Sequence, residues 1–552
     1  MKKFPVFAFM LLAGVMQVLA GGRQSGAQQT AQDLGPRGSG KAYWYYKYPQ
    51  TVTLHTVNFE YPYMDYHDGD NTANNPWTRV IKDYLNIQIA TDWIAGTVGD
   101  YSTKLNLAIA AREIPDFFQC GSTQFVQLQE AGLIADITDY LENNVSDTIK
   151  KRMASAPDIL DTVTRNGRIY AIPQGSYGPL TEPEILWLRK DWLEQAGVRA
   201  PGTIAELETL MQTFMKQHPG SYGIPLGGGL DEFAWLAVAW DAYPFFWYRA
   251  ADGSVVNGSV QPEVKQVLEV FADWYKKGYL KQDWMSSNSD TTRVDLMNNE
   301  FGIQLFPQWW GFVNAADMVA TNGKNSYMEA FDIPSATGKP VRHPRGFDNE
   351  GYIVFNKNSK NIAAALKCVS FYSEHGTEIG LSNEELSERF YHGESSHIMP
   401  MIKTLNSTGS MEGYLNLKRV RETGDTSFWD NLTYAEAPGK EEYEKELRPY
   451  LEEGNTALGI GRFLQIYSEN CAFDVSYKID SEKRWVYTAV TGPVPEEVAS
   501  YGSTLDDILR EGFAQIIVGQ RPISYFDTLV AMWKSSGGDH CTQVMNRVYG
   551  KK

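Results

Sequence analysis

The chain has 552 residues, of which 43% are hydrophobic and 13% aromatic. That length exceeds what one hydrophobic core usually supports, so the composition predicts two or more folded domains and excludes a disordered chain. The formal net charge of −17 disfavours nucleic acid and anionic lipid as partners, and it disfavours a highly anionic ligand unless a local basic pocket exists.

The first 20 residues have the pattern of a secretory leader. Lys2 and Lys3 precede an apolar run that ends in a small-x-small cleavage pattern at residues 18–20. A membrane anchor is the alternative, but the run is barely long enough to span a bilayer. Loss of the leader would take the net charge to −19, because the leader contains two lysines and no acidic residue. Residues 21–48 then read as a flexible, Gly-rich tether.

Four cysteines are spread along the chain, at Cys120, Cys368, Cys471 and Cys541. They lie too far apart for a metal-binding motif. In an oxidising compartment they allow three pairings, and at most one or two structural disulfides are expected. They could equally be free and buried, because a chain of this size does not need disulfides to fold.

The first folded segment alternates strands and helices. Apolar periodicity predicts strand, helix, strand, helix and strand at residues 51–58, 76–84, 87–93, 102–111 and 114–119. This order indicates βαβ units and a mostly parallel sheet, whose ligands would lie beyond the carboxyl ends of the strands. Phe59, Glu60 and Gln119 occupy those ends. The aspartates of residues 65–70 do not have calcium-loop spacing, and an Asx-rich turn is the better interpretation. No metal ion or cofactor is predicted.

Residues 169–191 predict a crossing between two lobes. Several glycines and prolines prevent a regular helix there, while Tyr177 and Glu182 offer a ring and a carboxylate with no core pattern to bury them. A second crossing is predicted at residues 345–352, which includes Asp348. We expect Gly175, Gly178 and Gly346 to absorb the rotation between the lobes.

The second half repeats the same kinds of element. Thr203 and Glu206 form a capping-box pattern, residues 222–226 predict a strand, and residues 261–278 predict a helix with Pro near its start and Gly past its end. A strand at residues 301–306 leads into Trp309 and Trp310. Most rings of the aromatic run at residues 233–248 should be core, and two terminal helices are predicted at 505–518 and 523–534.

Several blocks, in this order, resemble one family. They are residues 110–118 with 132–137, residues 188–193 with 201–207, residues 261–265 with 274–280, and the ending at 513–519 and 525–527. Together they resemble the extracellular solute-binding proteins of ABC importers, family 1, the carbohydrate group that includes maltose-binding protein. Lipoprotein relatives carry a Leu-Ala-Gly-Cys box, whereas this chain has Gly22 in place of the cysteine. That makes a lipid anchor doubtful and favours a soluble periplasmic or cell-surface protein.

The resemblance implies a two-lobed α/β architecture, the type II periplasmic binding protein fold, with mostly parallel sheets and hinge strands. It implies a first lobe at residues 49–174 and 350–420, and a second lobe at 178–345 and 421–552, with the boundary near 420 uncertain. It also implies a monomer that captures a carbohydrate, an oligosaccharide in particular, and delivers it to a membrane permease.

A sugar needs apolar rings for its C–H faces and polar groups for its hydroxyls. Trp309 and Trp310 are the favoured rings, with core burial as the alternative. The polar candidates are Glu60, Gln119, Glu182 and Asp348, followed by Tyr177, Trp235 and Asp241. A secreted glycoside hydrolase and a surface adhesion protein are the competing functions. Paired carboxylates would suffice for hydrolysis, but no nucleophile motif appears, so the chain is not predicted to be an enzyme.

Overall fold

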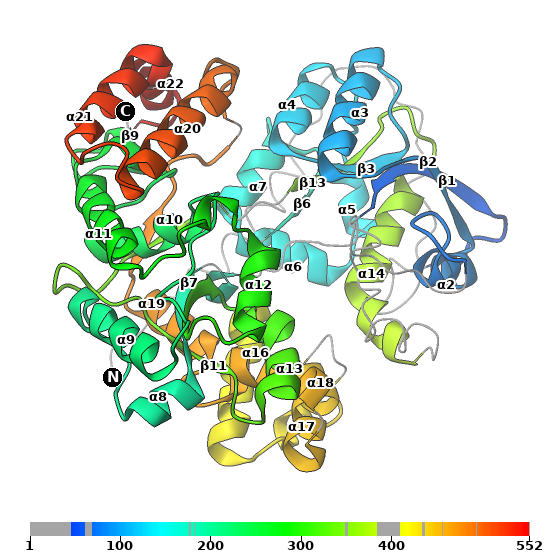
Figure 1. The fold of residues 1–552 in the computed structure, drawn as a ribbon. Helices are drawn as coiled ribbons and strands as arrows, with labels where there is room; N and C mark the ends of the chain where they lie inside the picture. The colour runs from blue at the N-terminus through cyan, green and yellow to red at the C-terminus, as the bar shows by residue number, and fades with distance from the viewer. Residues whose placement is uncertain are drawn as a thin grey trace, which may run out of the picture.

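The computed structural model of the chain describes residues 46–60, 69–175, 178–181, 183–347, 351–382, 409–432, 437–454, 456–492 and 494–550. Figure 1 shows two bodies side by side. We call the described residues of 46–175 and 351–382 the first lobe, which holds the blue and cyan elements together with α14 (Ile362–Ser382). The described residues of 183–347 and 409–550 form the second lobe. The chain therefore crosses between the lobes near residues 175–183 and 347–351.

The first-lobe sheet begins as the sequence predicts. β1 (Val52–Phe59) pairs in parallel with β2 (Ile87–Ala95), and α2 (Pro76–Leu85) lies between them in the chain. On its other side β1 adjoins β3 (Phe117–Cys120), where the Asp116 N–H donates to the His55 carbonyl at 3.0 Å. Beyond β3 come β13 (Gly351–Phe355) and then β6 (Ile172–Gln174).

The prediction of mostly parallel sheets is wrong. β13 pairs antiparallel with both β3 and β6. β6 ends at the edge where the chain leaves for the second lobe, whereas β13 returns from the second lobe and starts at that same edge, so the two must run in opposite directions. Parallel pairing joins β1 to β2 and β12 (His343–Arg345) to β14 (Trp485–Tyr487), and the other pairs among the described strands are antiparallel.

Alternating side chains fill both faces of the first-lobe sheet. On one face Phe117, Ile353 and Phe355 pack against α2, α5 (Thr138–Asn144), α6 (Asp147–Ser155) and α14. On the other, Phe118, Tyr352 and Val354 pack against α3 (Val98–Ala111) and α4 (Ser122–Glu130). α7 (Pro157–Val163) and the short β4 (Thr164–Arg165) and β5 (Arg168–Ile169) lead into β6. Two apolar layers thus hold the edge strands in register.

The second-lobe sheet is built around β7 (Glu184–Arg189), which is antiparallel to both β10 (Ile303–Pro307) and β11 (Met328–Phe331). β7 begins directly after the first crossing. Its first residue, Glu184, therefore lies at the edge that faces the first lobe, opposite Pro307 at the end of β10. The predicted strand at residues 222–226 is wrong: this segment has no strand structure.

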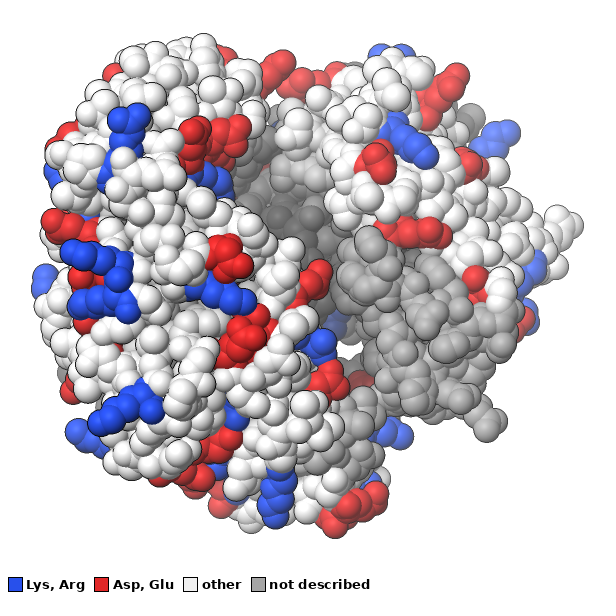
Figure 2. Space-filling view, viewed as in Figure 1, with Lys and Arg blue, Asp and Glu red and all other residues white. Residues whose placement is uncertain are grey.

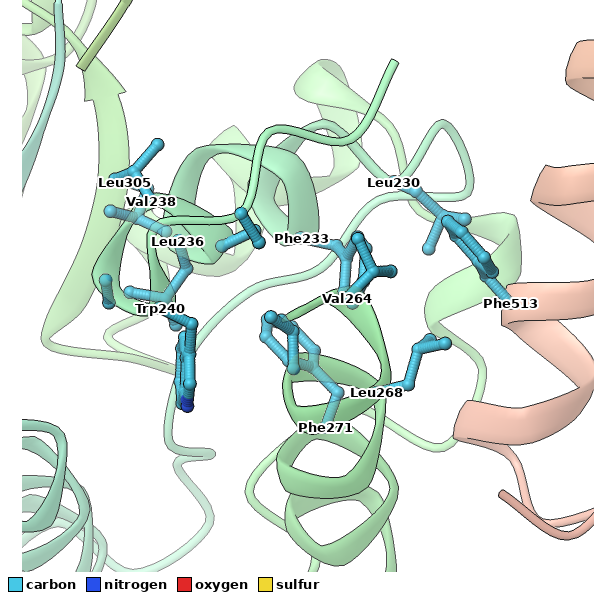
Figure 3. Packing of buried hydrophobic residues seen from close by; sticks show 14 of the residues in the cluster. Leu230, Phe233, Leu236, Val238, Trp240, Val264, Leu268, Phe271, Leu305 and Phe513 are labelled. Carbon is cyan, nitrogen blue, oxygen red and sulfur yellow. The ribbon is translucent and has the colours of Figure 1, made fainter. Parts of the chain in front are cut away.

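Helices cover both faces of this second sheet. Leu186, Leu188 and Leu305 point into the larger core, which is formed with α8 (Lys190–Ala196), α9 (Ile204–Gln217), α10 (Asp231–Ala237), α11 (Glu263–Lys277), α20 (Glu496–Ile517), α21 (Tyr525–Trp533) and α22 (Asp539–Tyr549). In Figure 3, Phe233 of α10 packs between Phe271 of α11 and Phe513 of α20, at ring-centroid distances of 5.1 and 5.6 Å. The terminal helices are therefore part of this core.

The capping box predicted for α9 is confirmed. The Thr203 hydroxyl accepts from the Glu206 N–H at 3.2 Å, and the Glu206 carboxylate accepts from the Thr203 N–H at 3.0 Å. These two bonds satisfy N–H groups that a helix start leaves without partners.

The described residues of 409–481 form a helical region that packs on the opposite face of the second sheet. It includes α16 (Gly409–Thr423), α17 (Arg448–Glu453), α18 (Thr456–Arg462) and α19 (Ala472–Ser481), and it adjoins α13 (Trp310–Asn322) and α12 (Ser289–Met297). Tyr414 and Leu417 of α16 share a cluster with Cys471 and Phe473. The sequence-based boundary near residue 420 would assign most of α16 to the first lobe, but the packing of α16 joins it to the second.

All four cysteines are free and buried. Burial raises the pKa of the Cys120, Cys368, Cys471 and Cys541 thiols, which keeps them protonated. In the part of the chain that the structure describes, no helix has both the length and the apolar character needed to cross a membrane.

Candidate functional site

A hollow separates the two lobes in Figure 2. The ends of β1, β3 and β6 and the start of β13 approach it from the first lobe. The start of β7 and the end of β10 approach it from the second. Since the two crossings join these same edges, residues at the strand ends are the ones that a ligand between the lobes would meet.

At the end of β1 the two predicted site residues, Phe59 and Glu60, have different environments. The Phe59 ring is only 7% exposed and packs on Tyr101, with ring centroids 5.3 Å apart. That packing favours a core role for the Phe59 ring over contact with a ligand. Glu60 is partly buried, and one of its carboxylate oxygens accepts a hydrogen bond from the Thr72 hydroxyl at 3.0 Å. Among the described residues this hydroxyl is the one side-chain donor to Glu60, and a carboxylate has capacity for further donors.

Gln119 of β3 keeps its place as a polar candidate. Its side-chain oxygen is buried and has no hydrogen-bond partner among the described residues. Gln174, at the end of β6, lies close by: a Cβ built on Gly351 would be 3.4 Å from Gln174 Oε1 and 3.6 Å from Gln119 Nε2. A hydroxyl entering from the hollow could donate to the Gln119 oxygen and remove its desolvation cost. Gln174 was missed, although its position before Gly175 at a strand end was the available signal.

The adjacent tryptophans at the end of β10 have different environments. Trp310 is fully buried, stacks on Trp187 at 5.3 Å, and donates from its indole N–H to Gln304 at 2.8 Å. Its burial favours the core alternative over a role as a platform. Trp309 is 42% exposed at the start of α13, and its ring meets Phe306 edge to face at 4.6 Å. An exposed ring held by a second ring is suited to stack on the C–H face of a sugar.

Asp241 is already engaged by the protein. Both of its oxygens accept from Arg342 Nη2, at 2.8 and 2.6 Å, and Tyr243 also donates to it. Burial alone would raise the pKa of Asp241, but the hydrogen bonds from Arg342 and Tyr243 outweigh burial and hold this pKa below its ordinary value. Trp235 of α10 is half-buried against the larger core. Asp241 thus fixes the chain locally, and Trp235 offers only part of its ring.

Glu184 is a carboxylate that sequence reasoning missed. It is partly buried at the first position of β7, and burial, with a smaller contribution from the charge of Asp231, raises its pKa to about 7. No described residue forms an ion pair with it. The polar atom at this crossing was expected at Glu182, two residues earlier. A carboxyl group that titrates near neutrality at the edge of a hollow can accept hydrogen bonds from a ligand when ionised.

Tyr177, Glu182 and Asp348, like the aspartates at positions 65 and 68, lie outside the described residues. Asp70 is described, and its carboxylate is paired with Arg79 at 2.9 Å. A separate pocket lined by Tyr140, Lys357 and Lys360 adjoins the start of α14. It lies where β13 ends, at the opposite edge of the sheet from the hollow, and so takes no part in this site.

The proposed hinge glycines differ in backbone conformation. Gly175 and Gly178 have φ values of +143° and +91°, which favour glycine, whereas Gly346 has no positive φ and a Cβ there would meet nothing within 4 Å. We expect Gly178→Ala to strain the first crossing by about 1–2 kcal/mol and to change ligand affinity several-fold. Gly346→Ala is the control, with a smaller effect. Calorimetric titration measures both, and equal affinities for both variants and the parent chain would contradict a hinge at Gly178.

Comparisons with known proteins agree with this architecture. A family model described as bacterial extracellular solute-binding protein matches residues 69–378. Lipoprotein LipO of Bacillus subtilis (strain 168) is 21% identical over 498 residues, covering 86% of this chain and 89% of LipO. The fructooligosaccharide ABC transporter substrate-binding protein FusA of Streptococcus pneumoniae serotype 4 is 25% identical over 166 residues, 27% of this chain and 30% of FusA.

Among solved structures, the alginate-binding protein AlgQ2, crystallised without calcium ion, superimposes with a TM-score of 0.61 at 14% identity, covering 91% of this chain and 98% of AlgQ2. That likeness confirms the two-lobed fold predicted from the sequence. Because the family model covers more than half of the residues and the fold agrees with it, the chain belongs to the family of bacterial extracellular solute-binding proteins.

Proposed function

We propose that this protein captures an oligosaccharide between its two lobes and delivers it to an ABC permease in the membrane. The observation that carries the proposal is the pair of facing edges. The first lobe offers Gln119 and Glu60, and the second offers the exposed Trp309 with Glu184. Polar acceptors and a ring on opposite sides of one hollow are what a sugar needs to be held on its hydroxyls and its C–H face.

The relatives support a sugar ligand and a transport role. FusA is named as a fructooligosaccharide-binding component of an ABC transporter, and AlgQ2 as an alginate-binding protein. Both ligands are oligomers or polymers of sugar units. The family binds solutes, so the chain is proposed to release its ligand unchanged and to act without catalysis.

Closure follows from contact with both lobes. A ligand that touches the first-lobe and second-lobe edges at once binds the closed state more tightly than the open one. A differential affinity of about a hundredfold, or roughly 2.7 kcal/mol, is enough to invert a modest preference for the open state. The permease would then recognise the closed form.

The location is proposed from the leader. Residues 1–20 direct export, and Gly22 in place of the lipobox cysteine favours a protein without a lipid anchor, although the relative LipO is a lipoprotein. We propose that the exported protein acts as a monomer outside the inner membrane.

Thermal unfolding with a panel of oligosaccharides tests the proposed function. A bound sugar at 100 times its Kd should raise the free energy of unfolding by about 2.7 kcal/mol. Chromatography of the same samples should recover the sugar intact. Turnover of the sugar would instead point to the glycoside hydrolase alternative, and stabilisation by no member of the panel would contradict the carbohydrate assignment.

A further inference from the structure

A small cavity lies on the first lobe, at the edge of the sheet opposite the hollow. Its volume is about 270 Å³, and it lies between α5 and the segment that joins β13 to α14. α5 and α14 share one core and lie side by side in Figure 1. The cavity is lined by Tyr140, by residues 357–360 and by the first two residues of α14. Among these described lining residues two are lysines and none is acidic.

The start of α14 leaves backbone N–H groups without acceptors. The Ala365 N–H donates to the Asn361 carbonyl at 3.0 Å, so the N–H groups of residues 362–364 precede the first bond of the helix. The Asn361 amide stands at the capping position but donates to the Thr53 carbonyl at 3.2 Å. Within the described residues, no acceptor bonds to these three N–H groups. Ile362 and Ala363 are buried at the cavity wall, where the helix dipole favours an anion.

The Tyr140 hydroxyl is a second, independent feature of the cavity. Tyr140 is only 6% exposed, yet its hydroxyl has no hydrogen-bond partner among the described residues. Burial raises the pKa of Tyr140, with a smaller contribution from the charge of Asp139, so the hydroxyl keeps its proton. Asp139 is itself paired with Arg168 at 2.8 Å. A ligand oxygen in the cavity would therefore remove the desolvation cost of a buried donor.

Side chains of the loop before α14 add further donors. Lys357 and Lys360 are exposed, and neither forms an ion pair with any residue that the structure describes. The buried Ser359 hydroxyl accepts from the Asn361 N–H at 3.1 Å, which leaves its own proton available to donate. The whole chain carries a net charge of −17, so an anion needs a local basic pocket of this kind.

These donors suit a ligand that has several charged oxygens on one centre. A phosphate group presents at least three strong acceptor oxygens, whereas a carboxylate has two. The cavity is also close to the lower limit of small-molecule sites, about 300 Å³. We propose that this cavity binds a phosphate group, held by the N–H groups at the start of α14, the Tyr140 hydroxyl and the ammonium groups of Lys357 and Lys360. Because the cavity is separate from the hollow, this site does not depend on the proposed sugar-binding function.

Two sources of phosphate are tested on the chain without its leader. Calorimetric titration with inorganic phosphate and with glycerol 3-phosphate measures binding of a soluble ligand. Sedimentation with phosphatidylglycerol vesicles, compared with phosphatidylcholine vesicles, measures binding of an anionic lipid headgroup. All samples contain about 0.15 M sodium chloride, which screens non-specific attraction. We expect at least one of the three phosphate probes to bind with a Kd below about 1 mM.

Matched variants locate the binding. Lys357→Gln with Lys360→Gln removes both charges and should weaken binding by about tenfold or more. Tyr140→Phe removes only the hydroxyl and should weaken binding several-fold, with circular dichroism to confirm that the variant is folded. The control is Lys276→Gln with Lys324→Gln, which removes the same charge from exposed positions of the second lobe and should leave binding unchanged.

The outcomes decide both the site and its ligand. Binding that the lysine pair at the cavity loses and the control pair keeps supports the proposal, and the probe that binds identifies the source of the phosphate. Equal losses in the two pairs would show attraction to the net charge alone and would overturn the site. Binding of none of the three phosphate probes overturns it as well, as does binding that is unchanged in both cavity variants.

Discussion

Replacing Trp310 by alanine is expected to lower the free energy of unfolding by about 3–5 kcal/mol. The side chain is fully buried, its ring stacks on Trp187 at 5.3 Å, and its N–H bonds to Gln304 at 2.8 Å. Truncation would leave a cavity between β7 and α13 and would strand the Gln304 oxygen. Urea unfolding followed by circular dichroism measures the loss.

Trp309→Ala is the matched control, because the same residue type is removed one position earlier. Trp309 is 42% exposed, so the loss of stability should be below about 1 kcal/mol. Removing the Trp309 ring should instead weaken binding, with sugar affinity reduced by about tenfold or more. Equal stability losses in the two variants would contradict the assignment of one ring to the core and the other to the ligand.

Glu184→Gln is expected to stabilise the protein at pH 8 and to leave its stability unchanged at pH 4. The pKa of Glu184 is raised to about 7 from an ordinary value of 4.5. Below pH 4.5 the carboxyl group is protonated in both the folded and unfolded states. As the pH rises to 7 the unfolded chain loses this proton first, so the parent protein loses stability across that window. The glutamine variant avoids the loss and should be more stable at pH 8 by about 1–2 kcal/mol.

The same residue should make sugar binding depend on pH. If hydroxyl groups of a neutral sugar donate to ionised Glu184, affinity in the parent chain should rise by up to about tenfold between pH 5.5 and pH 8. The Glu184→Gln variant should bind more weakly at pH 8 and show a flatter profile. Calorimetric titration across this range measures both. A parent profile that is flat, or that falls with rising pH, would show that ionised Glu184 does not accept from the ligand.

Local sequence patterns predicted the strands and helices at the start of the first lobe and one helix cap of the second lobe. The strand and helix order from β1 to β3 was read from apolar periodicity, and the Thr203–Glu206 capping box was read from two residues three positions apart. Such features depend on side chains within one or two turns of each other, so the sequence contains them directly. Local patterns did not predict the direction of the strands. β13 is antiparallel to its neighbours because of the route by which the chain returns from the second lobe.

The candidate site shows most clearly the difference between features set by local sequence and features set by the tertiary structure. The sequence by itself determined that two tryptophans follow a strand at the edge of the second lobe, and that polar residues stand at strand ends and crossings. Only the tertiary structure decided that Trp310 turns inward to Trp187 while Trp309 remains exposed, and that Glu184 is partly buried at the start of β7. The physical reason is that burial and charge pairing are set by segments far apart in the chain, such as β7 and α13, which no local periodicity brings together.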